Sequence, residues 1–290
     1  MFRGVKLVLI VVLGMTAIHC SSSRTVFESG PDASDVPPEP FIEPLEASVD
    51  AGRVEVECTG TNSQIYVLSS NPAAIHRFDP ETLTFTRLGY LDCPATSPFS
   101  MAVDRFNNAW VNFHAGKLAK VRLDDLHCEL LDFRNPPNGS WTFGMGFARN
   151  DDGKGETLFL SSSELFDLDS KTLEVSRVGS MNVFGMPELT GTGDGRLYGF
   201  TPDNGVVTRI DKSTGATIET HRTSAVEAGD WAFAQWGGDF WLFTRNGRQA
   251  SSMVTRYSPE TRASVVAVED SGIVIRGAGS STCAPFKPVQ

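Results

Sequence analysis

The chain repeats one pattern of short strands and turns five times, and this repeat restricts the fold more than any other feature of the sequence. In each repeat an aromatic residue, followed by an apolar or small one, opens a strand. The five pairs are Tyr66-Val67, Trp110-Val111, Phe159-Leu160, Tyr198-Gly199 and Trp241-Leu242. Successive pairs lie 44, 49, 39 and 43 residues apart. A period of about 40 to 45 residues in a chain of short strands favours a radial or stacked array of β units.

A tight turn follows the next strand of each repeat. It begins with an acidic or hydroxyl side chain, which can accept hydrogen bonds from the turn backbone. These residues are Asp79, Asp124, Asp169, Asp211 and Ser258. We therefore expect a hairpin between two outer strands in every repeat.

A third motif precedes the aromatic pair in four repeats, as Phe99-Ser100-Met101, Phe143-Gly144-Met145, Phe184-Gly185-Met186 and Phe233-Ala234-Gln235. Further turn signals separate this motif from the pair, so each repeat holds four strands joined by hairpins. Over residues 60 to 283 the chain resembles the broad class of bacterial propeller repeat proteins. The resemblance implies an all-β, five-bladed β-propeller with four-stranded antiparallel blades, and it implies no particular activity.

The first repeat lacks its innermost strand, and a strand of suitable length, residues 273–279, is left over near the C-terminus. The ring would close if this C-terminal strand paired with blade one, which would also protect a sheet edge. We therefore assign residues 54–290 to one propeller domain.

Four cysteines follow Cys20. If the chain is exported, as its N-terminus indicates, an even number of cysteines favours disulfides over metal binding or redox chemistry. Three pairings are possible. Cys58 precedes the second strand of blade one, and Cys283 follows the leftover inner strand. A Cys58–Cys283 bridge would therefore staple the ring at its seam, and Cys93–Cys128 would follow by elimination.

The N-terminus is typical of an export signal. Arg3 and Lys6 precede an apolar run, residues 7–13, that is too short to span a bilayer. Cys20 follows this run after residues 14–19 and precedes three serines, and this arrangement resembles a bacterial lipoprotein signal with Cys20 as the lipidated residue. The chain departs from that pattern at Ala17, where Leu is usual, and at bulky His19, so secretion without lipidation is the alternative. The expected division is a signal peptide at 1–19 and a lipidated, acidic tether at 20–53.

Charge excludes one class of partner. The formal net charge is −10, and loss of residues 1–19 would make it −12 because two basic residues are removed. The chain has no cluster of Lys and Arg that could bind a phosphate backbone, so we expect no nucleic acid partner.

Two carboxylates on the predicted inner strands, Asp104 and Glu188, are the candidate catalytic groups. Some five-bladed glycoside hydrolases, which the repeat resembles, use acidic residues at such positions as acid, base and transition-state support. Asp104 and Arg105 could equally form an ion pair beside a turn. Arg105 is retained as a candidate ligand-binding residue.

Trp236 is the other candidate ligand-binding residue, because it stands three residues after Phe233, where other repeats have Ala102, Gly146 and Pro187. A large ring there would plug the channel or offer a stacking platform. The three methionines of the third motif could bind a soft ion, but their register with Phe favours packing. Residues 150–156 are interpreted as a hairpin turn, since they lack the ligand pattern of a calcium loop. We expect no metal and no cofactor.

The leading functional hypothesis is a binding or scaffolding lipoprotein that presents one propeller face to a protein, peptide or glycan. We expect a monomer in the bacterial cell envelope, at the outer membrane or the periplasmic side, attached to the membrane through its lipid alone; a secreted protein is the alternative. The competing hypothesis is a hydrolase of the glycosidase or lactonase kind. An open polar axis with converging carboxylates would favour the hydrolase, and a plugged axis would favour the binder.

Lipidation can be tested at Cys20. The Cys20→Ala variant should lose its membrane association, because several acyl chains anchor a protein stably and none remains in the variant. Intact mass and membrane fractionation measure both properties, with Ser21→Ala as the control. A wild-type mass without acyl chains, together with equal fractionation of the two proteins, would contradict the anchor.

Overall fold

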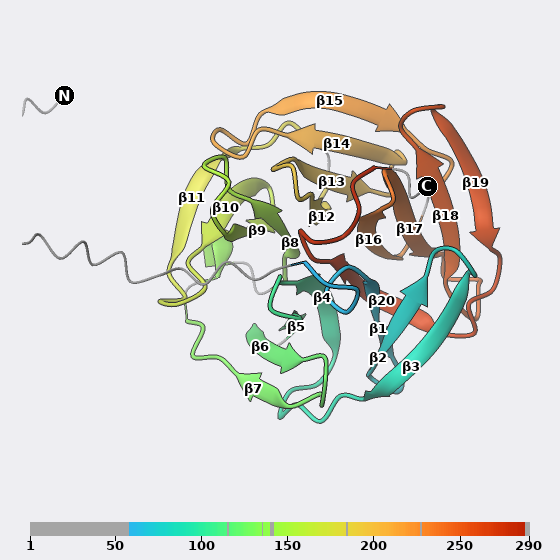
Figure 1. Ribbon diagram of the computed structural model, residues 1–290, viewed down its shortest axis with the longest axis horizontal. Coiled ribbons are helices and arrows are strands. Elements are labelled where there is room, and N and C mark those ends of the chain that lie inside the picture. The colour runs from blue at the N-terminus through green and yellow to red at the C-terminus, as the bar shows by residue number, and fades with distance from the viewer. Residues whose placement is uncertain are drawn as a thin grey trace, which may run out of the picture. The chain divides into compact units, whose positions relative to one another are not determined.

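A computed structural model describes residues 58–114, 116–134, 136–139, 142–183, 185–226 and 228–287. Within these residues the chain forms five four-stranded antiparallel sheets around a common centre (Figure 1). The predicted five-bladed β-propeller is therefore confirmed. The expected signal peptide at 1–19, Cys20 and the tether at 20–53 lie outside the described residues. No helix in the described part is both long and apolar enough to cross a membrane.

In every blade the strands are ordered from the axis outward. Blade one comprises β20 (Val274–Ser280), β1 (Ile65–Ser70), β2 (Ala74–Asp79) and β3 (Thr84–Tyr90). Blade two comprises β4 (Pro98–Val103), β5 (Asn108–Phe113), β6 (Lys117–Arg122) and β7 (Cys128–Leu130). Blade three comprises β8 (Gly144–Arg149), β9 (Glu156–Ser161), β10 (Glu164–Leu168) and β11 (Val175–Ser180). Blade four comprises β12 (Glu188–Gly191), β13 (Leu197–Thr201), β14 (Val206–Ile210) and β15 (Thr217–Arg222). Blade five comprises β16 (Asp230–Trp236), β17 (Asp239–Arg245), β18 (Met253–Ser258) and β19 (Ala263–Val268). A short 3-10 turn, η1 (Pro137–Gly139), lies between β7 and β8.

Five hydrophobic clusters hold the ring together, one at each junction between neighbouring blades. The repeated aromatic position supplies a buried side chain to every cluster: Tyr66, Trp110, Phe159, Tyr198 and Trp241. The outermost strands are largely exposed, and β3 has no fully buried residue. Apolar burial between blades, worth about 25 cal/mol per Å², therefore explains why this aromatic position recurs.

The predicted outer hairpins share one backbone conformation. In blade one the carboxylate of Asp79 accepts hydrogen bonds from the amides of Glu81 and Thr82, and Leu83, at φ 58°, closes the turn. Asp169 and Asp211 cap their turns in the same way. Blade two differs from the prediction, because its turn starts at Arg122, and Asp125 rather than Asp124 accepts the hydrogen bond from the backbone.

The ring closes as predicted. Strand β20 pairs antiparallel with β1, from Ile65 opposite Ser280 to Ser70 opposite Val274. The bridge Cys58–Cys283 links the chain just before β1 to the chain just after β20, across 225 residues. The second bridge, Cys93–Cys128, joins the segment after β3 to the start of β7 and so ties blade one to blade two. Both expected disulfides are confirmed.

The inner strands correct one part of the sequence alignment. Met101 pairs with Val111 and Met145 with Leu160, but the equivalent residue of blade four is Leu189, which pairs with Gly199. The prediction that Met186 continues the motif is therefore wrong, because β12 is short and begins only after Pro187, which has no amide proton to donate. Phe184 lies outside the described residues.

The turns gather on two faces of the ring. We call the end of the blades that carries Cys58–Cys283 and the hairpins after the inner strands the seam face. The opposite end, where the inner strands begin, is called the distal face. Because β1 and β20 run between Ile65/Ser280 on the seam face and Ser70/Val274 on the distal face, the two faces are separated by the length of a strand, about 20 Å.

The seam bridge should stabilise the ring more than the second bridge does. The chain-entropy model gives about 5 kcal/mol for a loop of 225 residues and about 4 kcal/mol for one of 35. The double variant Cys58→Ser/Cys283→Ser should therefore melt well below wild type in calorimetry, and proteases should cleave it first after Gly272. Cys93→Ser/Cys128→Ser is the matched control. A seam variant that melts at or above this control would show that the seam does not limit stability.

Candidate functional site

At one height along the propeller axis, the five inner strands carry four small residues and one long residue. Pairing with the second strands aligns Ser100, Gly144, Glu188, Ala232 and Gly277. The carboxylate of Glu188 accepts a hydrogen bond of 2.7 Å from the Ser100 hydroxyl of blade two and another from the backbone N–H of Met145 in blade three. Since blades two and four are not neighbours, the Glu188 side chain spans the centre of the ring.

Glu188 is buried, with 3% of its surface exposed. Burial raises its pKa to about 8, because the charged carboxylate loses its hydration, and the hydrogen bonds from Ser100 and Met145 offset only part of this cost. At neutral pH the side chain is therefore mainly a protonated, neutral acid that fills the space left by its small neighbours.

A small cavity lies beside Glu188 where the inner strands begin. We call it the axial recess; its volume is about 20 Å³. It is lined by Phe99, Glu188, Gly229, Asp230, Trp231 and Arg276. A cavity of this size holds about one water molecule. The recess is therefore too small for a sugar ring.

Two arginines neutralise the buried carboxylate of Asp230 at the rim of the recess. Arg245 donates from Nε at 2.6 Å and forms an ion pair through Nη2, and Arg276 donates from Nη1 to the other oxygen. These three groups leave one net positive charge. The nearby Trp231 Nε1 is buried and has no hydrogen-bond partner within the described part of the chain.

Asp104 has a structural role at the other end of β4. Its carboxylate accepts hydrogen bonds from the amides of Phe106 and Asn108, from the Asn108 side chain and from Trp110 Nε1, all at 2.9 or 3.0 Å. These donors occupy both oxygens and fix the β4–β5 hairpin. The alternative ion pair between Asp104 and Arg105 is not formed within the part of the chain that the structure describes.

The structure does not bring the two candidate catalytic carboxylates together. Glu188 of blade four is level with Ser100 of blade two. Asp104 lies four residues after Ser100, just beyond the end of β4. Four residues of strand correspond to about 13 Å along the axis. The two carboxyl groups of a glycosidase lie about 5 to 9.5 Å apart. Asp104 and Glu188 therefore do not form such a pair.

Arg105 belongs to a buried cluster at the seam, together with Glu156, which the sequence analysis missed. The Arg105 amide and the Thr282 hydroxyl each donate to Glu156 at 2.7 Å, and Arg105 Nη2 lies 3.4 Å from the sulfur of Cys58. Burial raises the pKa of Glu156 to about 7. The cluster joins blades two and three to the chain after β20. Only the closed ring brings these residues together, so no local sequence signal indicates the cluster.

Trp236 occupies a different position in the repeat from the one predicted. Phe233 pairs with Leu242 and so is equivalent to Met101, which places Trp236 level with Asp104 at the start of a hairpin. Its Nε1 donates to the Ser63 carbonyl at 2.9 Å, and its ring packs on the cluster between blades five and one. These contacts help to close the seam.

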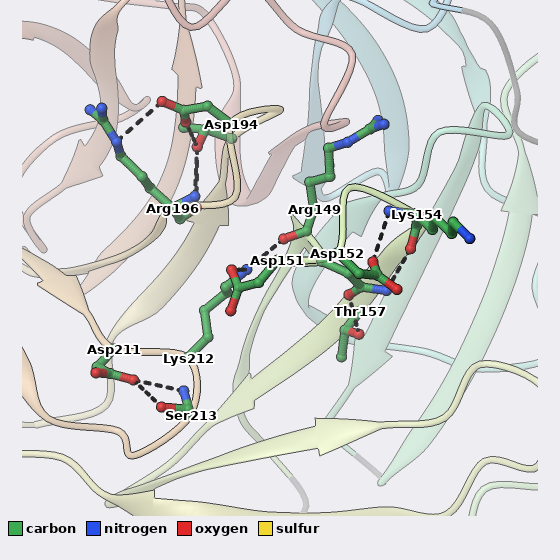
Figure 2. A network of polar contacts seen from close by, with 12 residues as sticks. Arg149, Asp151, Asp152, Lys154, Thr157, Asp194, Arg196, Asp211, Lys212 and Ser213 are labelled. Carbon is green, nitrogen blue, oxygen red and sulfur yellow. Dashed lines mark hydrogen bonds and ion pairs between the residues drawn. The ribbon is translucent and has the colours of Figure 1, made fainter.

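The seam face is also tied together between blades three and four (Figure 2). Lys212 Nζ donates to the Arg149 carbonyl at 2.6 Å and pairs with Asp151 at 2.7 Å. Residues 150–156 form the predicted hairpin turn, in which Asp152 accepts from the amide of Lys154. Within the described ranges no group of three or more His, Cys, Asp or Glu side chains is arranged to hold a metal ion. Met101 and Met145 are fully buried in two different interblade clusters.

A larger recess, also missed by the sequence analysis, lies on the distal face between blades one and five. We call it the interblade cleft; its volume is about 240 Å³. Its lining comes from β1, the β1–β2 turn, β2, β3, the start of β20 with the chain before it, and the β17–β18 loop of blade five. Arg276 of the axial recess lies beside it, with Nε 3.4 Å from the Ser70 hydroxyl that lines the cleft. The two recesses are therefore neighbours on one face.

No protein-family model and no curated protein sequence matches the chain. Among solved structures, a chain of a nidogen/laminin complex is similar with a TM-score of 0.49 and 11% identity, over 76% of this chain and 82% of that one. Virginiamycin B lyase from Staphylococcus aureus is similar with a TM-score of 0.40 and 14% identity, over 67% and 66% of the two chains. A streptogramin B lyase gives a TM-score of 0.40 and 14% identity, over 70% and 72%. Similarities at this level carry no inference about activity, so the propeller assignment rests on the five sheets themselves.

Titration of Glu188 should make stability depend on pH. Because its pKa rises from an ordinary value of 4.5 to about 8 on folding, the folded state holds an extra proton between these values. The stability linked to that proton is fully present below about pH 4.5 and is lost as the pH rises through 8. Glu188→Gln keeps a neutral side chain of similar shape and removes this loss.

The measurement is the melting temperature of both proteins from pH 5 to pH 9. The wild-type curve should fall relative to that of Glu188→Gln as the pH rises. Glu156 titrates with the same sign in both proteins and cancels in the comparison. Parallel curves would mean that Glu188 is ionised, or hydrated, at the axis.

Proposed function

We propose that this protein is an exported binding protein that presents its distal face to a protein, peptide or glycan partner. The proposal rests on the position of the axial recess and the interblade cleft on the same face of the ring. The axial recess and the interblade cleft both open where the inner strands begin, whereas the chain enters the domain at Cys58 on the seam face.

The two disulfides suggest an extracellular or periplasmic location, because disulfides persist in oxidising compartments. We propose further that Cys20 carries a lipid anchor and that residues 20–53 form an acidic tether in the cell envelope. A tether that joins the domain at Cys58 would be attached to the seam face, leaving the distal face available to a partner.

The state of the axis supports binding over hydrolysis. Glu188 and its small neighbours fill the centre, and the cavity beside it has room for about one water molecule. Asp104 is fully engaged in a hairpin and lies too far from Glu188 to act with it. The other carboxylate that lines the axial recess, Asp230, is paired with Arg245 and Arg276. It is therefore not free to act with Glu188 as a hydrolase of the glycosidase or lactonase kind would require, so the observations favour the binder.

Site-specific photo-crosslinking in intact cells tests which face binds. A photoreactive residue at Tyr90, which is 55% exposed and lines the interblade cleft, should give one reproducible crosslinked product. The same residue placed at Lys171, exposed in an outer turn of the seam face, is the matched control and should give none.

Products from Lys171 and not from Tyr90 would assign binding to the seam face and overturn the proposal. Products from neither position would overturn it as well. Competition by excess unlabelled protein separates a specific partner from random contact with the envelope.

A further inference from the structure

We propose that the interblade cleft binds a small organic carboxylate, whose negative charge forms an ion pair with the guanidinium of Arg87. This inference deepens the proposed function and rests on it for the choice of face. The cleft is lined by Ser69, Ser70, Asn71, Pro72, Ala74, His76, Arg87, Tyr90, Ala250, Gly272, Ile273 and Val274.

Arg87 is a cation without an acidic partner. Within the described residues it forms no ion pair, although the chain carries ten more acidic than basic side chains. Other described arginines, Arg222 among them, also form no ion pair, and Arg87 differs from them because it lines the cleft. An arginine that lines a cleft and has no acidic partner is therefore ready to bind an external anion.

The orientation of Arg87 leaves its hydrogen-bond donors free for a ligand. Its guanidinium carbon lies 4.6 Å from the centre of the Tyr90 ring. Stacking uses the flat face of the guanidinium, whereas its N–H groups point outward in the plane. Two of those parallel N–H groups match the two oxygens of a carboxylate, which is the basis of bidentate recognition.

The other titratable groups around the cleft do not cancel this charge. The pKa of His76 is lowered by burial and by Arg87, so His76 is neutral at pH 7. The nearby carboxylate of Asp270 accepts hydrogen bonds from the Ser251 hydroxyl and from the amide of Gly272. Both donors reach its Oδ1, and Asp270 is not part of the lining, although Gly272 is.

Size and lining restrict the rest of the ligand. At about 240 Å³ the cleft is smaller than sites for drug-sized molecules, which span about 300 to 1,000 Å³. Hydroxyls of Ser69 and Ser70 and the side chain of Asn71 offer further polar contacts, while Tyr90 offers an apolar ring. These features fit one sugar acid, or the carboxyl-terminal residue of a peptide. Both share the carboxylate, which is the chemistry that we assign.

Isothermal titration of the full-length, oxidised protein tests the assignment. The ligands are D-glucuronate, for a sugar acid, and N-acetylglycine, for a peptide terminus. Glucose and N-acetylglycinamide are their neutral counterparts, and inorganic phosphate is a general anion. At least one of the two carboxylates should bind at one site per chain, at least tenfold more tightly than its neutral counterpart and than phosphate.

The variant Arg87→Gln should weaken that binding at least tenfold. Arg222→Gln makes the same change on β15, the outermost strand of blade four, away from the cleft, and should bind like wild type. The carboxylate that binds more tightly identifies the source of the ligand. Equal binding of the neutral counterpart or of phosphate, unchanged binding in Arg87→Gln, or no binding of either carboxylate would overturn the proposal.

The titration tests the carboxylate site, and the crosslinking tests the proposed binding face, so the two proposals can fail separately. Crosslinking from Tyr90 depends on a partner approaching the distal face and does not require a carboxylate in the cleft. A protein that crosslinks from Tyr90 but binds neither acid would keep its proposed function and lose this inference.

Discussion

Strand β20 hydrogen-bonds to β1 although almost the whole domain lies between them in the sequence, and this pairing keeps the ring closed. Without it blade one would lose its inner strand, and the cluster between blades one and five would be exposed to water. The buried contacts at the seam all depend on this closure. Ser281 donates to the Asn62 carbonyl, Thr282 donates to Glu156, and Cys283 is bonded to Cys58. A propeller has no other place where its two ends must meet, which explains why covalent and polar contacts concentrate there.

Closure also determines what the centre can do. Five inner strands converge on the axis, and the level with Ser100, Gly144, Ala232 and Gly277 would leave a gap if the fifth residue were small as well. Glu188 fills that gap as a buried acid with a raised pKa. A perturbed carboxyl at an axis often indicates catalysis. Here its partners are a serine hydroxyl and a backbone amide, Asp104 is held in a hairpin far along the axis, and Asp230 is paired with two arginines, which favours a packing role for Glu188.

Polar groups on the two faces of the ring can be compared. On the seam face Lys212 ties the hairpins of blades three and four together, because it donates to the Arg149 carbonyl and pairs with Asp151. The distal face keeps groups that are not fully engaged, namely the stacked guanidinium of Arg87 and the indole N–H of Trp231. Polar groups that lack protein partners are the groups on which ligand recognition depends. These groups are the reason that the distal face is the one we propose for binding.

The sequence by itself determined the number of blades, the closing strand, the expected cysteine pairs and most of the outer turns. The blade count and the turns follow from local chemistry, because alternating apolar residues make strands, Asp caps turns, and a fixed period counts the units. The closing strand and the cysteine pairs follow from the single seam that a closed ring must have. Only the tertiary structure decided which inner-strand residues share a level. Blade four starts its inner strand late, after Pro187, so equal spacing from an aromatic residue misplaced Met186, and an insufficiently constrained alignment misplaced Trp236. The interblade cleft and the Glu156 cluster were likewise beyond the sequence, because each is assembled from blades that meet only when the ring is closed.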